Sequence, residues 1–169
     1  MSESQSIPAG AHIGHVHLKV ANLGRAIQFY RETMGFDLVA EYGSQAAFLS
    51  AGGYHHHIGL NTWESANGGP PASGTTGLYH FAINYPTRRD LAVALDRLIR
   101  APWPIDGASD HGTHEAIYLR DPDGNGIELA WDRDKSLWTR PDGTIEMTTQ
   151  ALDLPGLLRE IEMTTTAGT

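Results

Sequence analysis

A strand and helix pattern occurs twice in this sequence, and the repeat constrains the fold more than any other feature. Residues 15–36 read HVHLKVANLGRAIQFYRETMGF, and residues 80–99 read HFAINYPTRRDLAVALDRLI. Each copy begins with a histidine and a short stretch in which apolar and polar residues alternate, which is typical of a strand with one buried face. Each then changes to the spacing of three or four residues that indicates an amphipathic helix. Two copies of one supersecondary unit are therefore expected.

Capping residues mark both predicted helices. Asn22 is a suitable N-cap for the first helix, and Gly35 stands where a left-handed residue ends a helix. In the second copy Thr87 is the expected N-cap and Asp90 holds the third helical position. Short strands are expected after each helix, with the sequences AAFLS and HHHIGLNTW in the first copy and EAIYL and GIELAW in the second. The repeated unit is predicted to be βαβββ.

The segment 64–77, ESANGGPPASGTTG, is rich in Gly, Pro and Ser and is predicted to be a linker. It separates two modules, about residues 11–63 and 78–132, within a single domain of residues 11–138. Residues 139–169 form a C-terminal extension. One module alone would leave a sheet face and its edges uncovered. The two modules are therefore expected to form an α+β fold, with a curved mixed sheet around a metal-binding cleft.

Composition excludes several classes of partner. The net charge of −8 and the pI near 5.5 argue against nucleic acid, because proteins that bind it concentrate Lys and Arg. The longest apolar runs are too short for a membrane span, so no membrane partner is expected. The N-terminus, MSESQSIPAG, lacks a signal-peptide pattern, and the chain has no cysteine, which together favour a cytoplasmic location.

The repeat also predicts a metal site. Alignment of the two copies places His15 on His80, and it places Gly59 on Glu128. If the modules face each other, three of the four equivalent positions supply metal ligands, namely His15, His80 and Glu128. A histidine on a strand is more often solvated than bound to metal, but its recurrence at equivalent positions favours the metal site. Two imidazoles and one carboxylate suit non-haem Fe(II), and these ligand types also accept Mn, Ni or Zn.

The motifs HVHLKV, LYHFAI and DPDGNGIEL, at this spacing, resemble the vicinal-oxygen-chelate superfamily. The superfamily includes glyoxalase I, extradiol catechol dioxygenases, fosfomycin-resistance transferases and bleomycin-binding proteins. The resemblance covers roughly residues 12–138. It implies a metal site built from paired βαβββ modules.

Further details resemble the extradiol branch, the catechol 2,3-dioxygenases. Glyoxalase I carries a carboxylate where this chain has Gly59, whereas extradiol enzymes place a histidine three residues earlier, which implies His56 as the acid/base. They also place a tyrosine ten residues before the metal glutamate, which Tyr118 matches, and a histidine in an HG context before it, which His111 resembles. His111 precedes Tyr118 by seven residues instead of the usual nine. His114 therefore remains a substitute for His111.

The three consecutive histidines leave an alternative open. Strict alternation from Gly59 directs His55 and His57 into the cleft, whereas the family alignment selects His56. A bulge or a loop before Ile58 would reconcile the two interpretations. His57 is the second choice for the acid/base.

The resemblance implies an Fe(II)-dependent extradiol-type ring-cleaving dioxygenase that acts on a catechol-like aromatic with O2. One alternative is a divalent-metal lyase or transferase similar to glyoxalase or the fosfomycin transferases. Another is a metal-free, drug-binding protein. Familiar extradiol enzymes contain more modules than this chain, so a homodimer is expected to cover its exposed edges.

Overall fold

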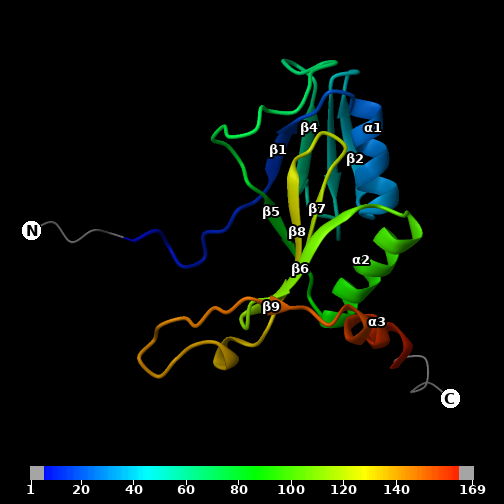
Figure 1. Cartoon of the computed structure of the whole chain (residues 1–169). Coiled ribbons are helices and arrows are strands. Elements are labelled where there is room, and N and C mark those ends of the chain that lie inside the picture. The colour runs from blue at the N-terminus through cyan, green and yellow to red at the C-terminus, as the bar shows by residue number, and fades with distance from the viewer. Residues whose placement is uncertain (1–5, 164–169) are drawn as a thin grey trace, which may run out of the picture.

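Two βαβββ modules form the body of the protein (Figure 1), in a computed structural model that describes residues 6–163. The first module contains β1 (Val16–Lys19), α1 (Leu23–Gln28), the π-helical segment η1 (Phe29–Thr33), β2 (Asp37–Tyr42), β3 (Ala46–Ser50) and β4 (Ile58–Asn61). The second contains β5 (Phe81–Asn84), α2 (Arg88–Arg100), β6 (Ile105–Asp110), β7 (His114–Arg120) and β8 (Gly126–Asp132). They are followed by the short 3-10 helix η2 (Lys135–Leu137), β9 (Gln150–Ala151) and α3 (Leu154–Met163). The predicted α+β fold of two repeated modules is confirmed.

The strands form two mixed sheets. Their orders are β1-β4-β3-β2 and β5-β8-β7-β6-β9, with β1 parallel to β4, β5 parallel to β8 and all other neighbours antiparallel. Within residues 6–163, no ladder of hydrogen bonds joins β1 to β5, so the expected curved sheet is divided at this point. A cavity of about 670 Å³ takes part of its lining from both strands.

The predicted helix caps are present. The Asn22 side chain accepts a hydrogen bond from the backbone N of Arg25 at 2.9 Å, and Thr87 accepts one from the backbone N of Asp90 at 3.1 Å. Gly35 has a φ of +86°, the left-handed conformation that ends the first helix. The first strand after each helix, β2 and β6, was not located from the sequence. The segments DLVAEY and IDGASD contain few large apolar residues in alternation, which explains the omission.

One apolar core spans both modules. The helices α1 and α2 contact one face of the sheets, and Tyr30, Leu60, Leu95 and Ile127 are among the fully or nearly fully buried residues there. Burial of apolar surface is worth about 25 cal/mol per Å². The apolar area that the two modules share in this core therefore stabilises their pairing. The polar faces of the strands point away from it.

The turn between β7 and β8 ties the second module to the first. Tyr30 donates a hydrogen bond to Asp121 Oδ2 at 3.2 Å, and Arg25 pairs with Asp123 Oδ1 at 2.6 Å. Burial, followed by the nearby charge on Asp121, raises the pKa of Tyr30, so its hydroxyl stays protonated as a donor. The DPDGNG motif therefore has a structural role in docking the two modules.

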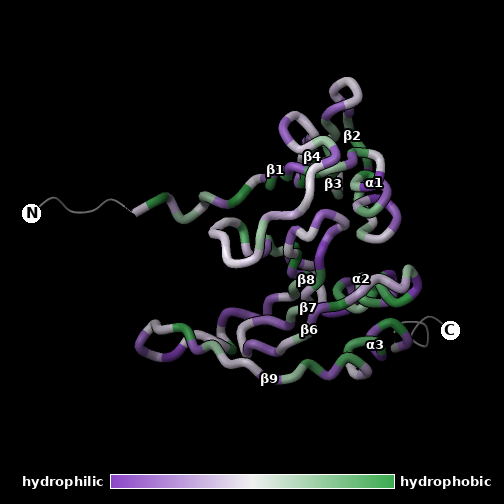
Figure 2. The backbone as a smooth tube through the Cα atoms, turned by 45° about the horizontal axis from the view of Figure 1, so that its top comes forward, coloured by the Kyte–Doolittle hydropathy of each residue, from purple (hydrophilic) through white to green (hydrophobic). Residues whose placement is uncertain are grey.

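The C-terminal extension joins the second module. Strand β9 pairs with β6, adding a fifth strand to the sheet, and α3 packs along α2, as Figure 2 shows. Leu157 of α3 is fully buried in the shared core. No helix in the portion of the chain from residue 6 to 163 is long and apolar enough to cross a membrane.

Replacing Leu157 by alanine should lower the free energy of unfolding by about 2 to 5 kcal/mol, because it leaves a cavity in the core. Urea unfolding followed by circular dichroism measures the change. Met147, which is 63% exposed in the same extension, provides the matched control, and its alanine variant should change stability by less than about 0.5 kcal/mol. Equal effects of the two substitutions would show that α3 does not contribute to the core.

Candidate functional site

The carboxylate of Glu128 lies at the centre of the second sheet's polar face. Glu128 stands opposite Ala82 of β5 and Tyr118 of β7, and only 7% of the residue is exposed. His80 Nε2 lies 2.9 Å from Glu128 Oε2, and His114 Nε2 lies 3.0 Å from Glu128 Oε1. Each carboxylate oxygen therefore accepts a hydrogen bond from one imidazole. Two of the three predicted metal ligands meet here.

The third predicted ligand, His15, lies in the first module beside His56. The centroids of the two rings are 4.3 Å apart, and the ring centroid of Phe48 lies 5.0 Å from that of His56. Burial, and then the nearby charge of His15 and His55, lowers the pKa of His56. A neutral imidazole of this kind is able to accept a proton.

His57 faces a different environment from its neighbour. Its Nδ1 accepts a hydrogen bond from the backbone N of Ala51 at 3.3 Å and lies 3.2 Å from Ser50 Oγ. Strand β4 begins at Ile58, so the three histidines precede the strand and strict alternation does not apply to them. The residue that the family alignment selects, His56, is the one in close ring contact with His15.

Tyr118 lies on the same face of the second sheet as Glu128, and His111 lies in the turn between β6 and β7. His111 Nε2 is 2.8 Å from the Tyr118 hydroxyl, and the rings of His111 and His114 are 4.8 Å apart. Burial, and then the charge of Glu128, raises the pKa of Tyr118. Tyr118 and His80 also line a cavity of about 250 Å³. The predicted pair of His111 and Tyr118 is thus in direct contact. His114, the substitute for His111, instead contacts the Glu128 carboxylate.

The structure does not gather all the predicted metal ligands. Across the described part of the chain, no group of three His, Asp or Glu side chains has the geometry to hold a metal ion. His15 lines the larger cavity and His80 the smaller one. The donor types of His15, His80 and Glu128 nevertheless fit a divalent ion, since two neutral imidazoles and one carboxylate are common ligands for such ions.

Comparison with known proteins places this arrangement in a family. Residues 12–129 match the Glyoxalase/Bleomycin resistance protein/Dioxygenase superfamily. The chain belongs to this superfamily. It is 45% identical over 156 residues to a catechol-2,3-dioxygenase of Bacillus subtilis (strain 168). This match covers 92% of this chain and 54% of the relative. It is 31% identical over 131 residues to biphenyl-2,3-diol 1,2-dioxygenase 3 of Rhodococcus globerulus, covering 71% of this chain and 63% of that protein.

The chain thus spans only part of the length of these two relatives. Among solved structures, a glyoxalase/dioxygenase from Nostoc punctiforme superposes with a TM-score of 0.62 at 18% identity. The match covers 79% of this chain and all of that one, and it supports the fold alone.

In this superfamily member, the position equivalent to Glu128 is blocked in the first module. His17 stands opposite Gly59 in the parallel β1 and β4 pair, as Ala82 stands opposite Glu128 in the β5 and β8 pair. This matching register agrees with the alignment of the two copies. A Cβ atom on Gly59 would lie 2.9 Å from Cγ of the His17 ring. The imidazole therefore covers the space that a fourth ligand would need.

A Gly59→Ala substitution should lower the free energy of unfolding by about 1 to 3 kcal/mol, because its methyl group overlaps the His17 ring. The double variant His17→Ser, Gly59→Ala should recover most of this loss, since serine removes the obstructing ring. Thermal unfolding of the two single variants and the double variant measures the coupling. If the stability changes of the two single variants simply add in the double variant, the His17 ring moves away freely from the new methyl group.

Two contacts of the candidate site have no signal in the sequence. The backbone carbonyl of Thr148 lies 2.9 Å from His111 Nδ1, although the residues are 37 positions apart. The ion pair of Arg133 with Asp110 holds the start of the turn that carries His111, with N to O distances of 2.7 and 2.9 Å. A basic or acidic residue beside a strand is ordinarily solvated, so the sequence does not distinguish these residues.

Proposed function

We propose that this chain provides the active site of an Fe(II)-dependent extradiol-type dioxygenase, which cleaves the ring of a catechol-like aromatic with O2. The observation that carries the proposal is the 45% identity to a catechol-2,3-dioxygenase over 92% of this chain. The contact between His80 and Glu128 supports it, because these are two of the proposed metal ligands. As the chain spans 54% of that relative, the activity of the whole protein is part of the proposal.

His15, His80 and Glu128 would hold the metal. A bound Fe(II) ion would lower the pKa of a catechol hydroxyl and bring substrate and O2 into neighbouring positions. His114 remains on the other oxygen of Glu128, where its hydrogen bond fixes the orientation of the carboxylate. Mn, Ni or Zn would accept the same donor types, and metal analysis of the purified protein identifies the ion.

The other residues of the site would handle protons and orientation. His56, whose pKa is lowered by burial and by the neighbouring histidines, would accept a proton from a substrate hydroxyl as a general base. Tyr118 would hydrogen-bond a substrate oxygen, and His111 would orient the Tyr118 hydroxyl through the contact between them. The two modules would therefore act from opposite sides of the substrate.

A second candidate function is that of a divalent-metal lyase or transferase. The chain is 30% identical to a probable lactoylglutathione lyase of Vibrio cholerae serotype O1 and covers 86% of that protein. Against this candidate, Gly59 supplies no carboxylate at the position where the resemblance to glyoxalase implies one, and His17 covers the space. The dioxygenase proposal requires only His15, His80 and Glu128, all of which the sequence contains.

Oxygen uptake by protein loaded anaerobically with Fe(II) tests the proposal against a panel of catechols. Wild-type protein should consume O2 and form a yellow ring-opened product, and Glu128→Ala should do neither. His56→Phe should retain iron and lose rate by about 100-fold or more, in the range of general-base catalysis. Bound metal without oxygen uptake would favour the lyase or transferase, and absence of both would favour a metal-free binding protein.

We also propose that the chain forms a homodimer. Apolar residues beside β1 and β5, each of which has one edge unpaired among residues 6–163, support this proposal, since Ile13 is 86% exposed and Tyr79 is 83% exposed. A second copy would cover these side chains and edges. Sedimentation equilibrium should give about twice the chain mass, and the mass of a single chain would contradict the proposal.

A further inference from the structure

We infer that the C-terminal extension positions the candidate site, because the Thr148 carbonyl fixes the tautomer of His111 and thereby the direction of its hydrogen bond with Tyr118. Two distances carry this inference. His111 Nδ1 lies 2.9 Å from the Thr148 carbonyl oxygen, and His111 Nε2 lies 2.8 Å from the Tyr118 hydroxyl. The ring is therefore held between the extension and strand β7.

The direction of both hydrogen bonds follows from the chemistry of the groups. A carbonyl oxygen only accepts, so its 2.9 Å contact assigns a proton to His111 Nδ1. The Thr149 hydroxyl lies farther from the same nitrogen, at 3.3 Å, and a hydroxyl oxygen is also able to accept. In the neutral imidazole, Nε2 is then unprotonated and accepts, so the Tyr118 hydroxyl donates to it. The phenolic proton of Tyr118 thus points to His111, and the lone pairs of its oxygen remain available on the site side.

The extension is anchored to the turn that bears His111 by a second backbone contact. The Thr148 backbone N donates to the His111 carbonyl oxygen at 2.9 Å, and β9 then pairs with β6 through Ser109 and Asp110. Gly112 has a φ of +75° and allows close approach, since a Cβ there would lie 3.1 Å from Thr148 Oγ1. The hydrogen bond of the Thr148 N–H and the pairing of β9 with β6 therefore hold the Thr148 carbonyl in place.

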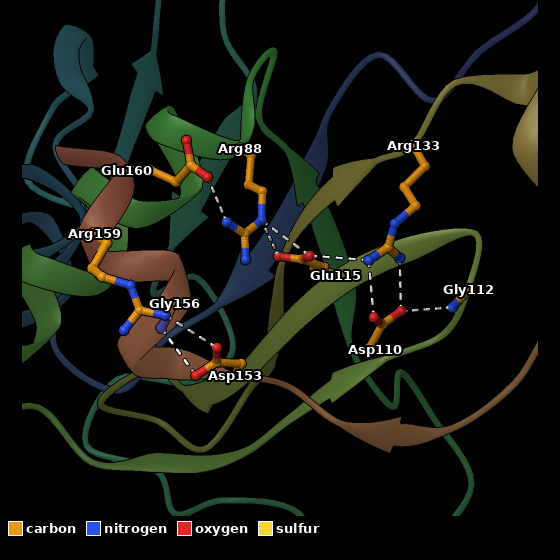
Figure 3. A network of polar contacts seen from close by, with 9 residues as sticks. All are labelled: Arg88, Asp110, Gly112, Glu115, Arg133, Asp153, Gly156, Arg159 and Glu160. Carbon is orange, nitrogen blue, oxygen red and sulfur yellow. Dashed lines mark hydrogen bonds and ion pairs between the residues drawn. The ribbon is translucent and has the colours of Figure 1, made fainter. Parts of the chain in front are cut away.

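A chain of ion pairs connects α3 to the same turn (Figure 3). Glu160 of α3 contacts Arg88 at 2.6 Å, and Arg88 contacts the buried Glu115 of β7 at 2.9 Å. Arg133 contacts both Glu115, at 3.0 Å, and Asp110, at 2.7 Å. Asp110 in turn accepts from the backbone N of Gly112 at 2.8 Å. These contacts hold the far end of the extension and the His111 turn in one rigid assembly.

The effect of this positioning on turnover rests on the proposed function, whereas the tautomer itself does not. If the ring were free to adopt the other tautomer, Nε2 would donate to Tyr118, and the phenolic proton would turn toward the substrate. The Thr148 carbonyl selects against this alternative. Tyr118 would contact the substrate, and His111 and Thr148 act on it as positioning residues.

A long-range ¹H–¹⁵N correlation spectrum of the ¹⁵N-labelled full chain tests the inference, at a pH where the imidazoles are neutral. His111 is assigned by the loss of its signals in His111→Gln. We expect Nδ1 to resonate as a protonated nitrogen and Nε2 as an unprotonated one. A wild-type spectrum with protonated Nε2, or with an average of both tautomers, would overturn the inference without any variant.

Substitution of Thr148 tests the origin of the preference. Thr148→Pro removes the N–H donor to His111 and displaces the carbonyl, so both tautomers should appear and catechol turnover should fall at least about tenfold. Met147→Pro, one residue earlier at a 63% exposed position, is the matched control and should keep the tautomer and the turnover.

A folded Thr148→Pro protein that retains protonated Nδ1 would also overturn the inference. A wild-type protein with the expected tautomer and no oxygen uptake would refute the proposed function alone. The two failures are therefore distinguishable.

Discussion

A Glu128→Ala variant should bind a divalent ion at least about 100-fold more weakly than the wild type, because loss of a direct ligand exceeds the 10 to 100-fold cost of losing a supporting residue. The substitution also removes the acceptor for His80 and His114, both of which contact this carboxylate. Anaerobic titration calorimetry with Fe(II), and with Mn(II) as an air-stable probe, measures the affinity directly.

The control for this experiment is Glu32→Ala. Glu32 is exposed, and its carboxylate accepts a hydrogen bond from Gln28 one helical turn earlier, away from the candidate site. The affinity of the Glu32→Ala variant for the ion should equal that of the wild type. If Glu128→Ala also retained wild-type affinity, the assignment of His15, His80 and Glu128 as ligands would be wrong, whatever the activity of the protein.

An Asp121→Ala variant should lose about 3 to 5 kcal/mol of unfolding free energy, because one buried donor and several partly buried donors lose their acceptor together. Asp121 is 4% exposed and accepts from the backbone N of Asp123 and of Asn125, each at 2.9 Å. It also accepts from the Asn125 side chain and from Tyr30 in the other module. Urea denaturation measures the loss.

The matched control is Asp142→Ala, in a turn of similar local chemistry. Asp142 accepts from the backbone N of Thr144 at 3.0 Å, but its turn is exposed. Water replaces the lost acceptor there, so the cost should be below about 1 kcal/mol. A similar loss in both variants would mean that the Tyr30 contact and the burial of Asp121 contribute nothing to module docking.

Periodicity and caps predicted the repeated unit because both are local signals. Asn22 and Thr87 lie within three residues of the backbone groups that they cap, so each helix start could be read directly. The alignment of the copies also predicted that Gly59 and Glu128 occupy equivalent places, and the strand registers agree with it. The sequence did not locate strands β2 and β6 because their residues do not alternate in polarity.

The arrangement of the site depended on contacts that local patterns do not encode. Alternation of side chains counted back from Gly59 favoured His55 and His57 as the residues that face the cleft. This alternation holds only within a strand, and β4 begins after all three histidines. The sequence offers His114 as a substitute for His111, and the structure shows that His114 of β7 hydrogen-bonds Glu128 of the neighbouring strand β8. Tyr30 and Asp121 meet across 91 residues through the docking of the modules, which a local pattern does not reveal.

The His17 ring above Gly59 also bears on the order in which a site of this kind changes during evolution. A glutamate introduced at Gly59 while the ring is present would meet it within contact distance and destabilise the sheet before it could bind anything. Loss of the His17 ring before that change would remove the overlap. Of the two orders in which a fourth protein ligand could arise, the one that removes the ring first therefore avoids this loss of stability.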